Sequence, residues 1–343
     1  MRDVMDTIEQ WQGEGQPVAL ATVVQTWGSS PRQAGAKMAL TPGGQMAGSV
    51  SGGCVEGAVY DEGVAALKSG AARLLHFGVA DETAWEVGLA CGGSIDVFVQ
   101  PLPPDFFAAE RAALIDNVPF AVVTVVTGPA ELLGKAVLAG EKGLRWGSLG
   151  SPARDVAAVD LAQAALAQGT SRRATLAEGV EAFVEVVLPP PTLIAVGGVH
   201  ITIALVALAK VLGYTTIVVD PRKYFGNEAR FPHVDKLVQA WPDEAMADIP
   251  LTRGTAVAML THDPKLDDPA LKLVLPSPAF YVGALGSRNT QSKRRQRLLD
   301  EGLTPEQVAR IKGPIGLELN GHTPEEIALS IMAQIVAERN KAG

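Results

Sequence analysis

The sequence predicts an α/β protein: an N-terminal duplicated α+β domain, followed by a Rossmann-like domain built on a doubly wound parallel sheet. Three observations lead to this prediction. A pattern of strands and one helix occurs twice before residue 190, strand and helix patterns alternate after residue 191, and proline clusters at 101–105 and 188–192 divide these regions. Such clusters resist helices and central strands and usually mark linkers. We therefore expect a first repeat copy (1–105), a second copy that packs on it (106–190) and the Rossmann-like domain (191–343).

The internal repeat is visible as three pairs of matching stretches. In each copy they are followed by a helix-like stretch and a closing strand, "IDVFVQPLPP" in the first and "VEAFVEVVLPPP" in the second. The spacing between matching stretches shrinks along the chain, so the first copy holds extra residues near 78–94. We expect each half to cover the other's apolar face. The pairs are "PVALATVV" (17–24) with "PFAVVTVV" (119–126), "GAKMAL" (35–40) with "GKAVLA" (134–139), and "GSVSGG" (48–53) with "GSLGSP" (147–152).

The third segment alternates short apolar strands with helical patterns, which is typical of a parallel, doubly wound sheet. After its first strand, residues 201–212 place apolar side chains on one helical face, and Gly213 suits the helix end. In the last helix, Thr323 and Glu326 fit a capping box, with Pro324 at the favoured first position. The expected strands are "TLIAVGG", "TTIVVD", "KLVQAW", "TAVAMLTHD" and "AFYVGALGS".

The composition narrows the class of protein. With 343 residues, 47% of them hydrophobic, the chain is long enough for about two domains with buried cores. A net charge of −8 argues against binding to nucleic acid or anionic membranes. The apolar runs are too short to span a bilayer. The opening "MRDVMDTIEQWQGEG" has the pattern of an amphipathic helix without the apolar region of a signal peptide, so we expect a cytoplasmic protein.

The stretch "GSVSGGCVEGAV" (48–59) is the first candidate for chemistry. Paired glycines, Gly52 and Gly53, precede Cys54, and Glu56 follows it in what is predicted to be the first turn of a helix. Backbone N–H groups at a helix start attract anions and favour a thiolate, which is the nucleophilic and metal-binding form of cysteine. We therefore expect Cys54 to be catalytic or a metal ligand, the glycines to clear space beside its sulfur, and Glu56 to shuttle a proton or orient a partner.

Cys91 repeats this arrangement, because Gly92 and Gly93 follow it in the stretch that only the first copy contains. A lone cysteine is more often a buried, inert packing residue. The second copy has Ala153 in place of Cys54, however, so the shared fold does not require a thiol there. Two cysteines also cannot staple a chain of this size. We therefore predict a functional thiol pair and leave the distance between the sulfur atoms open.

The Rossmann-like segment opens with an altered dinucleotide fingerprint. "VGGVHIT" follows a strand and begins a helix, with Gly197 at the turn, and Asp220 ends the next strand, where such folds bind a ribose hydroxyl. Val199 stands at the second glycine position, and its β-branched side chain obstructs the approach of a pyrophosphate. The sequence therefore argues against ordinary NAD(P) binding, and a crossover without any ligand is the alternative.

Further polar residues follow the ends of the predicted parallel strands, where ligands bind in sheets of this type. The "GSR" turn offers backbone amides and a guanidinium to a phosphate, and the "HD" pair offers an acid–base couple or ligands. Each residue alone is more often an ordinary loop residue, but together they indicate a cofactor site. The candidates are His200, His262, Asp263, Gly286, Ser287 and Arg288.

Two other groups of residues are interpreted as structural. One is a basic run in a helical pattern, which is typical of a solvated helix face. The other is a pair of histidines without a recognisable partner pattern. The residues are Lys293, Arg294, Arg295 and Arg297 in the basic run, and His76 and His233.

Taken together, these motifs resemble the XdhC/CoxI family, the accessory factors of xanthine dehydrogenase and related molybdenum hydroxylases. The similarity covers nearly the whole chain, and the middle copy (about 106–188) has the fewest motifs. The chain departs from the family where "GGVHI" stands in place of "GAGHV", which counts against a dinucleotide role but keeps His200. The matching stretches are "ATVVQTWGSSPRQAGAKM", "GSVSGGCVEGAV", "AWEVGLACGGSIDVFV", "VVDPR", "LTHDPKLDDPAL", "YVGALGSR" and "GPIGLELNGHTPEEIALSIMAQIV".

The resemblance implies a chaperone that binds the molybdenum cofactor (molybdopterin, in a plain or nucleotide form), supports its sulfuration and delivers it to an apo molybdenum hydroxylase. It makes Cys54 and Cys91 candidate molybdenum contacts, since soft thiolates suit such a metal. A cysteine desulfurase and a second copy of the chain are further candidate partners. Two alternatives stay open: an oxidoreductase that uses NAD(P) or a flavin in the third segment, and an assembly scaffold with inert cysteines.

Overall fold

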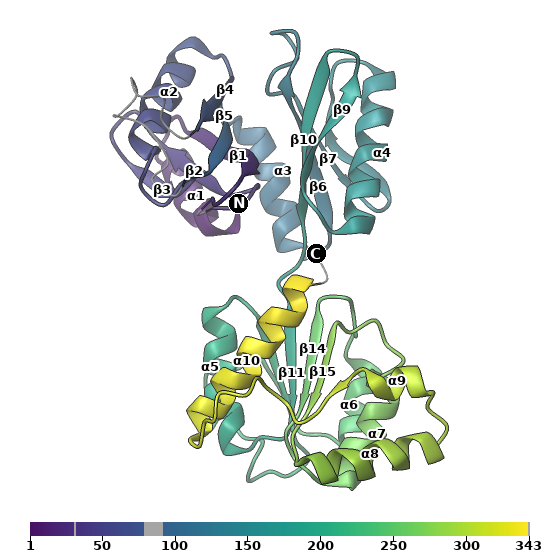
Figure 1. The fold of residues 1–343 in the computed structure, drawn as a ribbon. Helices are drawn as coiled ribbons and strands as arrows, with labels where there is room; N and C mark the ends of the chain where they lie inside the picture. The colour runs from purple at the N-terminus through teal and green to yellow at the C-terminus, as the bar shows by residue number, and fades with distance from the viewer. Residues whose placement is uncertain (31, 79–91, 342–343) are drawn as a thin grey trace. The chain divides into compact units, whose positions relative to one another are not determined.

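The structure, a computed structural model, describes residues 1–30, 32–78 and 92–341. The chain divides into two compact units, Met1–Pro189 (unit 1) and Pro190–Gly343 (unit 2), which Figure 1 shows as ribbons. Unit 1 contains both repeat copies, and unit 2 contains a parallel sheet with helices, so the predicted fold class is confirmed. Over the described ranges, every helix is too short or too polar to cross a membrane.

Unit 1 contains two five-stranded antiparallel sheets with the same topology. The strand order is β3-β2-β1-β5-β4 in the first sheet and β8-β7-β6-β10-β9 in the second, so each strand has a counterpart in the other copy. The elements of the first copy are η1 (Arg2–Val4), α1 (Met5–Gly13), β1 (Ala19–Trp27), β2 (Lys37–Leu40), β3 (Met46–Gly48), α2 (Glu56–Ser69), β4 (Arg73–Phe77) and β5 (Ser94–Pro101). Those that follow are α3 (Pro104–Ile115), β6 (Phe120–Thr127), β7 (Ala136–Gly140), β8 (Gly143–Gly147), α4 (Pro152–Gln168), β9 (Arg172–Ala177) and β10 (Val180–Val187).

The two sheets of unit 1 pack face to face, and α2 and α4 cover their outer faces (Figure 1). Between the sheets, Val24 and Phe98 of the first copy contact Val126 and Phe183 at the equivalent positions of the second. This arrangement follows from the period-2 pattern of the strands, which sends alternate apolar side chains to the helix and to the other sheet. Each half therefore buries the inner face of the other.

Charged side chains are also buried between the sheets. Lys37 Nζ lies 2.7 Å from Glu185 Oε2 and 3.4 Å from Thr22 Oγ1, and all three residues line a cavity of about 20 Å³, large enough for one water molecule. Glu110 of α3 is 1% exposed, and its Oε1 has no hydrogen-bond partner among the described residues. Burial raises the pKa of Glu110 to about 7, although the nearby Lys37 ammonium opposes the shift.

The two copies differ in the connection before the last strand. In the second copy only Glu178 and Gly179 separate β9 from β10. In the first copy residues 78–93 separate β4 from β5, and 79–91 of these lie outside the described residues. Apart from this connection, the last two strands of each copy pair in the same way, since β4–β5 and β9–β10 are both antiparallel neighbours. The expected extra residues near 78–94 in the first copy are therefore confirmed.

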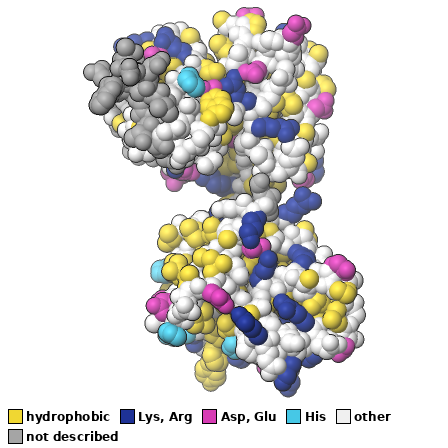
Figure 2. All heavy atoms as spheres, viewed as in Figure 1, with side chains coloured by type: hydrophobic (Ala, Val, Ile, Leu, Met, Phe, Trp, Pro, Cys, Tyr) yellow, Lys and Arg dark blue, Asp and Glu magenta, His cyan; other side chains and the backbone are white. Residues whose placement is uncertain are grey.

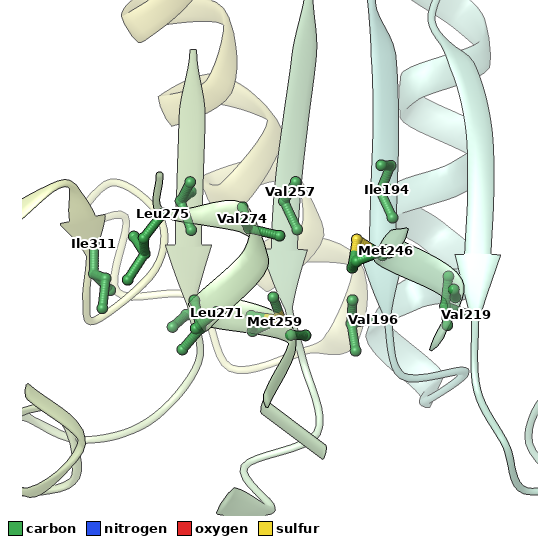
Figure 3. Close-up of a cluster of buried hydrophobic side chains, with 14 of the residues drawn as sticks. Ile194, Val196, Val219, Met246, Val257, Met259, Leu271, Val274, Leu275 and Ile311 are labelled. Carbon is green, nitrogen blue, oxygen red and sulfur yellow. The ribbon is translucent and has the colours of Figure 1, made fainter. Parts of the chain in front are cut away.

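Unit 2 is built on a six-stranded parallel sheet of order β13-β12-β11-β14-β15-β16, as in doubly wound folds. Apolar side chains fill both faces, and Figure 3 shows part of the cluster formed by one face with α6 and α7. The strands are β11 (Thr192–Val196), β12 (Thr215–Val219), β13 (Lys236–Val238), β14 (Thr255–Met259), β15 (Tyr281–Ala284) and β16 (Ile311–Lys312). The helices are α5 (His200–Val211), α6 (Pro242–Asp248), α7 (Pro264–Val274), α8 (Arg288–Asp300), α9 (Pro305–Ala309) and α10 (Pro324–Lys341).

Two local predictions for unit 2 have different outcomes. The capping box of the last helix is confirmed, because the N–H of Glu326 donates to Thr323 Oγ1 at 3.2 Å and the N–H of Thr323 donates to Glu326 Oε2 at 3.0 Å. The solvated interpretation of the basic run is wrong for Arg294, which is 1% exposed. Its guanidinium lies 2.8 Å from the buried carboxylate of Asp267. This partner lies on another helix and cannot be recognised from the local sequence. The ion pair with it keeps Arg294 buried.

Candidate functional site

The loop that carries Cys54 connects β3 to α2. Cys54 is exposed and its thiol is free. The prediction that it lies in the first helical turn is wrong, because α2 begins at Glu56 with Val55 as its N-cap. Hydrogen bonds from the loop to the Glu56 side chain hold residues 51–55 in a non-helical path.

The carboxylate of Glu56 organises this loop. Its Oε1 accepts hydrogen bonds from Ser49 Oγ at 2.6 Å and from the N–H groups of Val50 and Ser51 at 3.2 and 2.9 Å. Its Oε2 accepts from Ser51 Oγ at 2.5 Å and from the N–H of Gly53 at 2.9 Å. Five donors from the loop therefore converge on one side chain of the following helix.

The N–H groups next to the thiol are occupied as well. Ser51 Oγ accepts from the N–H groups of Cys54 and Val55, both at 3.0 Å, and Ser49 Oγ accepts from the N–H of Gly52 at 2.8 Å. The expectation of unpaired N–H groups that favour a thiolate at Cys54 is therefore wrong. The loop instead presents an exposed sulfur on a backbone held by internal hydrogen bonds.

The electrostatics of Glu56 follow from these contacts. Burial alone raises the pKa of a carboxyl group, but the hydrogen bonds from Ser49, Ser51 and the backbone outweigh burial and lower the pKa of Glu56 to about 2. Glu56 is therefore ionised at neutral pH. Proton shuttling by Glu56 stays a prediction, and these contacts favour the other expected role, that of an orienting group.

The second copy repeats this loop without the thiol. Asp155, at the position equivalent to Glu56, accepts a hydrogen bond from Ser148 Oγ at 2.8 Å and one from the next backbone N–H at 2.6 Å. Ala153 stands at the position of Cys54. The fold therefore uses an acidic residue in both copies, whereas the thiol is an addition to the first.

Cys91 lies outside the described residues, but the glycines that follow it are described. A Cβ on Gly93 would collide with the carbonyl of Ser29, and one on Gly28 would lie 3.4 Å from Gly93 Cα, so this glycine pair packs against the loop after β1. Because neighbouring strands are antiparallel, β1 and β3 run toward the end of the sheet from which β5 starts, although β1 reaches Ser94 and β3 stops level with Val99 of β5. The loops with Gly52–Gly53 and Gly92–Gly93 therefore leave the first sheet from the same end, which we call the loop end.

His76, for which the sequence indicates no partner and only a structural role, also lies toward the loop end. His76 on β4 pairs with Asp96 on β5, and its Nδ1 lies 2.7 Å from Asp96 Oδ1. The other oxygen of Asp96 accepts a hydrogen bond from Arg173 of the second copy at 2.7 Å. These residues come from three strands far apart in sequence, so no spacing reveals them. The one sequence signal is Asp96, an acidic residue inside the apolar run "IDVFV".

In unit 2, the carboxyl ends of the strands bring several predicted residues to one edge of the sheet. Gly197 follows β11, and a Cβ there would lie 2.7 Å from Thr261 Cγ2 in the loop after β14. These two loops flank the point where the strand order reverses, which is where ligands bind in such sheets. His200 is exposed at the start of α5, and His262 is exposed in the left-handed region with a φ of 63°.

Asp220 lies at the same edge but is fully buried, and both of its oxygens have partners. Oδ1 accepts from the N–H and Nε of Arg222, each at 2.9 Å, and Oδ2 accepts from the N–H of Gly198 at 2.8 Å. Burial alone raises the pKa of Asp220, but these hydrogen bonds outweigh it and lower the pKa. A Cβ on Gly198 would collide with the carbonyl of Phe225, so the turn is covered by the chain itself. Ribose binding by Asp220 stays a prediction.

The remaining candidates in unit 2 stand at helix starts. Asp263 is the N-cap of α7, where its side chain accepts a backbone N–H at 2.9 Å, and Ser287 is the N-cap of α8 after Gly286, whose φ is 131°. The Arg288 side chain is 87% exposed and lies 3.5 Å from Glu318. Figure 2 shows Lys and Arg side chains on the visible face of unit 2 around α8 and α9. The described part of the chain contains no cluster of three or more His, Cys, Asp or Glu side chains placed to hold a metal ion.

Comparisons with known proteins define the family. The family described as "XdhC Rossmann domain" matches residues 193–335, and the "XdhC and CoxI family" matches residues 11–78. One match falls in each unit, and together they span more than half of the chain. The chain belongs to the XdhC and CoxI family, and the resemblance noted from its motifs is confirmed.

Individual relatives agree with this assignment. The chain is 26% identical over 328 residues to a probable xanthine dehydrogenase subunit of Bacillus subtilis (strain 168), covering 94% of this chain and 93% of that protein. It is 26% identical over 326 residues to the "Molybdenum cofactor insertion chaperone PaoD" of Escherichia coli (strain K12), covering 95% of this chain and 84% of that protein. A crystal structure of a xanthine dehydrogenase from Bacillus halodurans has the same fold, with a TM-score of 0.75, 24% identity, and coverage of 98% of this chain and 96% of that one.

Proposed function

We propose that this protein is an accessory factor that binds the molybdenum cofactor, supports its sulfuration and delivers it to an apo hydroxylase of the xanthine dehydrogenase type. Support for the broad role comes from the family and from relatives named for cofactor insertion and for xanthine dehydrogenase. The observation that carries the proposal is the exposed thiol of Cys54, on a loop whose counterpart has Ala153.

Cys54 is proposed to contact the molybdenum centre of the cargo or to carry the sulfur that it receives. A thiolate is a soft ligand suited to such a metal. The flanking Gly52 and Gly53 are exposed and add no side chain beside the sulfur, which suits a bulky cargo. Glu56 acts as a positioning residue, since its carboxylate fixes the loop backbone before and after the glycine pair. Cys91 is proposed as the second thiol of this pair, on the strength of its sequence context alone.

The edge of the sheet in unit 2 is proposed to hold the phosphate or nucleotide end of the cargo. Arg288 offers an exposed guanidinium at the start of α8, beside the Ser287 turn, and a helix start favours an anion. His200, His262 and Asp263 follow other strand ends at this edge and are proposed as further contacts. The covered turn at Gly198 and the occupied oxygens of Asp220 weigh against an oxidoreductase that binds NAD(P) here.

Delivery requires contact with an apo molybdenum hydroxylase, and sulfuration requires a sulfur donor. We propose a cysteine desulfurase as that donor, since its product is a sulfur atom carried on a cysteine thiol, which exchanges between thiols. A cytoplasmic location and a homodimer are part of the same proposal. Neither affects the chemistry assigned to Cys54.

The deciding experiment is binding of anaerobically prepared molybdenum cofactor, with bound molybdenum quantified per chain. Cys54→Ser is expected to lower retention at least about tenfold, equivalent to about 1.4 kcal/mol. Cys91→Ser tests the second thiol in the same way, and Ala153→Ser on the second copy is the matched control that keeps full retention. Arg288→Ala is expected to weaken binding without abolishing it. Full retention by the Cys54→Ser Cys91→Ser double variant would contradict the proposal and favour a scaffold with inert cysteines.

A further inference from the structure

The pair formed by His76 and Asp96 has the geometry of an oriented acid–base group. The His76 side chain is 64% exposed, whereas that of Asp96 is 9% exposed and anchored by Arg173. An ionised carboxylate only accepts hydrogen bonds, so the proton of the 2.7 Å contact belongs to His76 Nδ1. The Nδ1 contact therefore fixes the tautomer and leaves the lone pair of the neutral imidazole on Nε2.

Among the described residues, Gly78 leaves space beside Nε2 of His76. A Cβ built on Gly78 would lie 3.5 Å from Nε2 and 3.4 Å from Ser94 Oγ, so the missing side chain keeps this position open. The ring of Trp27, whose side chain is 46% exposed, meets the imidazole edge-on with centroids 5.9 Å apart. Glycines 92 and 93 border the same loop end. Glycine is the residue that lets a ligand approach the backbone closely.

The second copy provides an internal comparison. Thr175 pairs with Glu181 in the second sheet as His76 pairs with Asp96 in the first, so Thr175 occupies the position equivalent to His76. The shared fold thus keeps an acidic residue on the inner strand but needs no imidazole on the outer one. His76, like Cys54, is a chemical group added to one copy only.

We propose that His76 is a catalytic acid–base residue of the cargo site, and that its Nε2 accepts the proton of a thiol when a thiol-bearing ligand binds at the loop end. The assignment rests on the proposed carrier function and deepens it. The S–H bond breaks, its electron pair stays on sulfur as a thiolate, and the proton forms the Nε2–H bond. Asp96 balances the imidazolium charge, while Arg173 and Glu181 are the other charged groups of this cluster. The same proton returns to sulfur when the ligand leaves.

The test distinguishes Nε2 of His76, which is proposed to react, from Nδ1, which contacts Asp96. His76→Asn keeps an N–H donor for Asp96 but removes Nε2. We expect uptake of anaerobically prepared molybdopterin-form cofactor to slow about 100-fold at neutral pH and to lose its pH dependence, in line with a general acid–base contribution. Thr175→Asn, the matched change on the second copy, is expected to keep the wild-type rate and pH profile.

A second variant guards against misfolding of the first. Gly78→Val leaves His76 in place but puts carbon atoms in front of Nε2, at a glycine whose backbone does not need a positive φ. It is expected to slow uptake in the same direction, with an unfolding midpoint close to that of wild type. In a Cys54→Ser background the His76→Asn effect is expected to persist, because the thiol belongs to the ligand, and its loss would overturn this assignment.

The outcomes distinguish this assignment from the carrier function. If the wild-type protein takes up cofactor, and both His76→Asn and Gly78→Val keep its rate and pH profile, then the role of His76 is overturned but the carrier function is not. A wild-type protein that takes up no cofactor overturns the carrier function, and the assignment falls with it.

Discussion

Glu56 and Asp155 hold equivalent loops in the two halves of unit 1. Each carboxylate accepts hydrogen bonds from the serine that follows the third strand and from the next backbone N–H. A residue type found in both halves serves the fold, while a chemical group found in one half is free to serve function. By this criterion the acidic position is structural, and Cys54 and His76 are functional candidates.

The first prediction concerns the cost of removing the thiol. Cys54→Ala is expected to change the free energy of unfolding by no more than about 0.5 kcal/mol, because the side chain is exposed and the second copy folds with alanine at this position. Val50→Ala is the control in the same loop and is expected to cost about 1–3 kcal/mol, since Val50 is fully buried. Urea unfolding monitored by circular dichroism measures both. A Cys54→Ala cost as large as the control's would show that the thiol is structural.

The second prediction concerns the acid side of stability. The pKa of Glu56 is lowered to about 2 in the folded chain, so its contribution is fully present above the ordinary value of 4.5 and is lost as pH falls toward about 2. Glu56→Gln is expected to cost about 1–3 kcal/mol at neutral pH, because the amide nitrogen cannot accept hydrogen bonds from the loop. The variant should also lack the wild-type loss of stability between about pH 4.5 and about pH 2 that this carboxyl causes. Asp155→Asn is the matched change on the second copy. Equal wild-type and Glu56→Gln stability at neutral pH would contradict this account.

The third prediction concerns Glu110, whose contribution to stability changes with pH in the opposite direction to that of Glu56. Burial raises the pKa of Glu110 to about 7, so the folded chain binds this proton more tightly than the unfolded chain does. The resulting stability is fully present below pH 4.5 and is lost as pH rises through about 7. Glu110→Gln is expected to remove a decline on the order of 2 kcal/mol between about pH 5 and about pH 8. Urea midpoints measured across this range test it, with Glu9→Gln as the exposed control. An identical slope in wild type and Glu110→Gln would refute the assignment.

The fourth prediction concerns the buried ion pair of unit 2. Arg294→Met leaves the Asp267 carboxylate buried without its partner, and the expected cost is about 3–5 kcal/mol. The double variant Asp267→Leu Arg294→Met is expected to recover most of this loss, because it removes both charges together. Chemical unfolding of the two variants gives the comparison. A double variant less stable than the single one would mean that Thr261, which donates to Asp267, dominates instead.

The fifth prediction concerns nicotinamide cofactors. Titration with NADH is expected to leave its fluorescence unchanged, because Val199 and the Phe225 carbonyl obstruct the turn that binds pyrophosphate in dinucleotide-binding folds. Val199→Gly is not expected to create NADH binding, since the Phe225 backbone still covers Gly198. Saturable enhancement of NADH fluorescence by wild type would revive the oxidoreductase alternative.

Hydrophobic periodicity and internal repetition can be read directly along the sequence, and for this reason they predicted the architecture well. The matching of "GSVSGG" with "GSLGSP" anticipated the paired loops of Glu56 and Asp155, and the shrinking spacing anticipated the long connection before β5. The start of α2 was missed because five loop donors bind the Glu56 carboxylate, an arrangement that helix signals do not encode. The burial of Arg294 and the partner of His76 were missed for a related reason. Their partners, Asp267 and Asp96, stand on other elements and become neighbours only in the folded chain.

The two-residue turn at Glu178–Gly179 has a practical consequence for protein engineering. In the first sheet the corresponding connection, between Phe77 and Ser94, is much longer. A strand pair of this kind therefore tolerates a long insertion at this position. A fluorescent reporter or an affinity peptide spliced between β9 and β10 would therefore join the half that lacks Cys54. The proposed exchange of cargo could then be followed in real time with a reporter that replaces neither Cys54 nor His76.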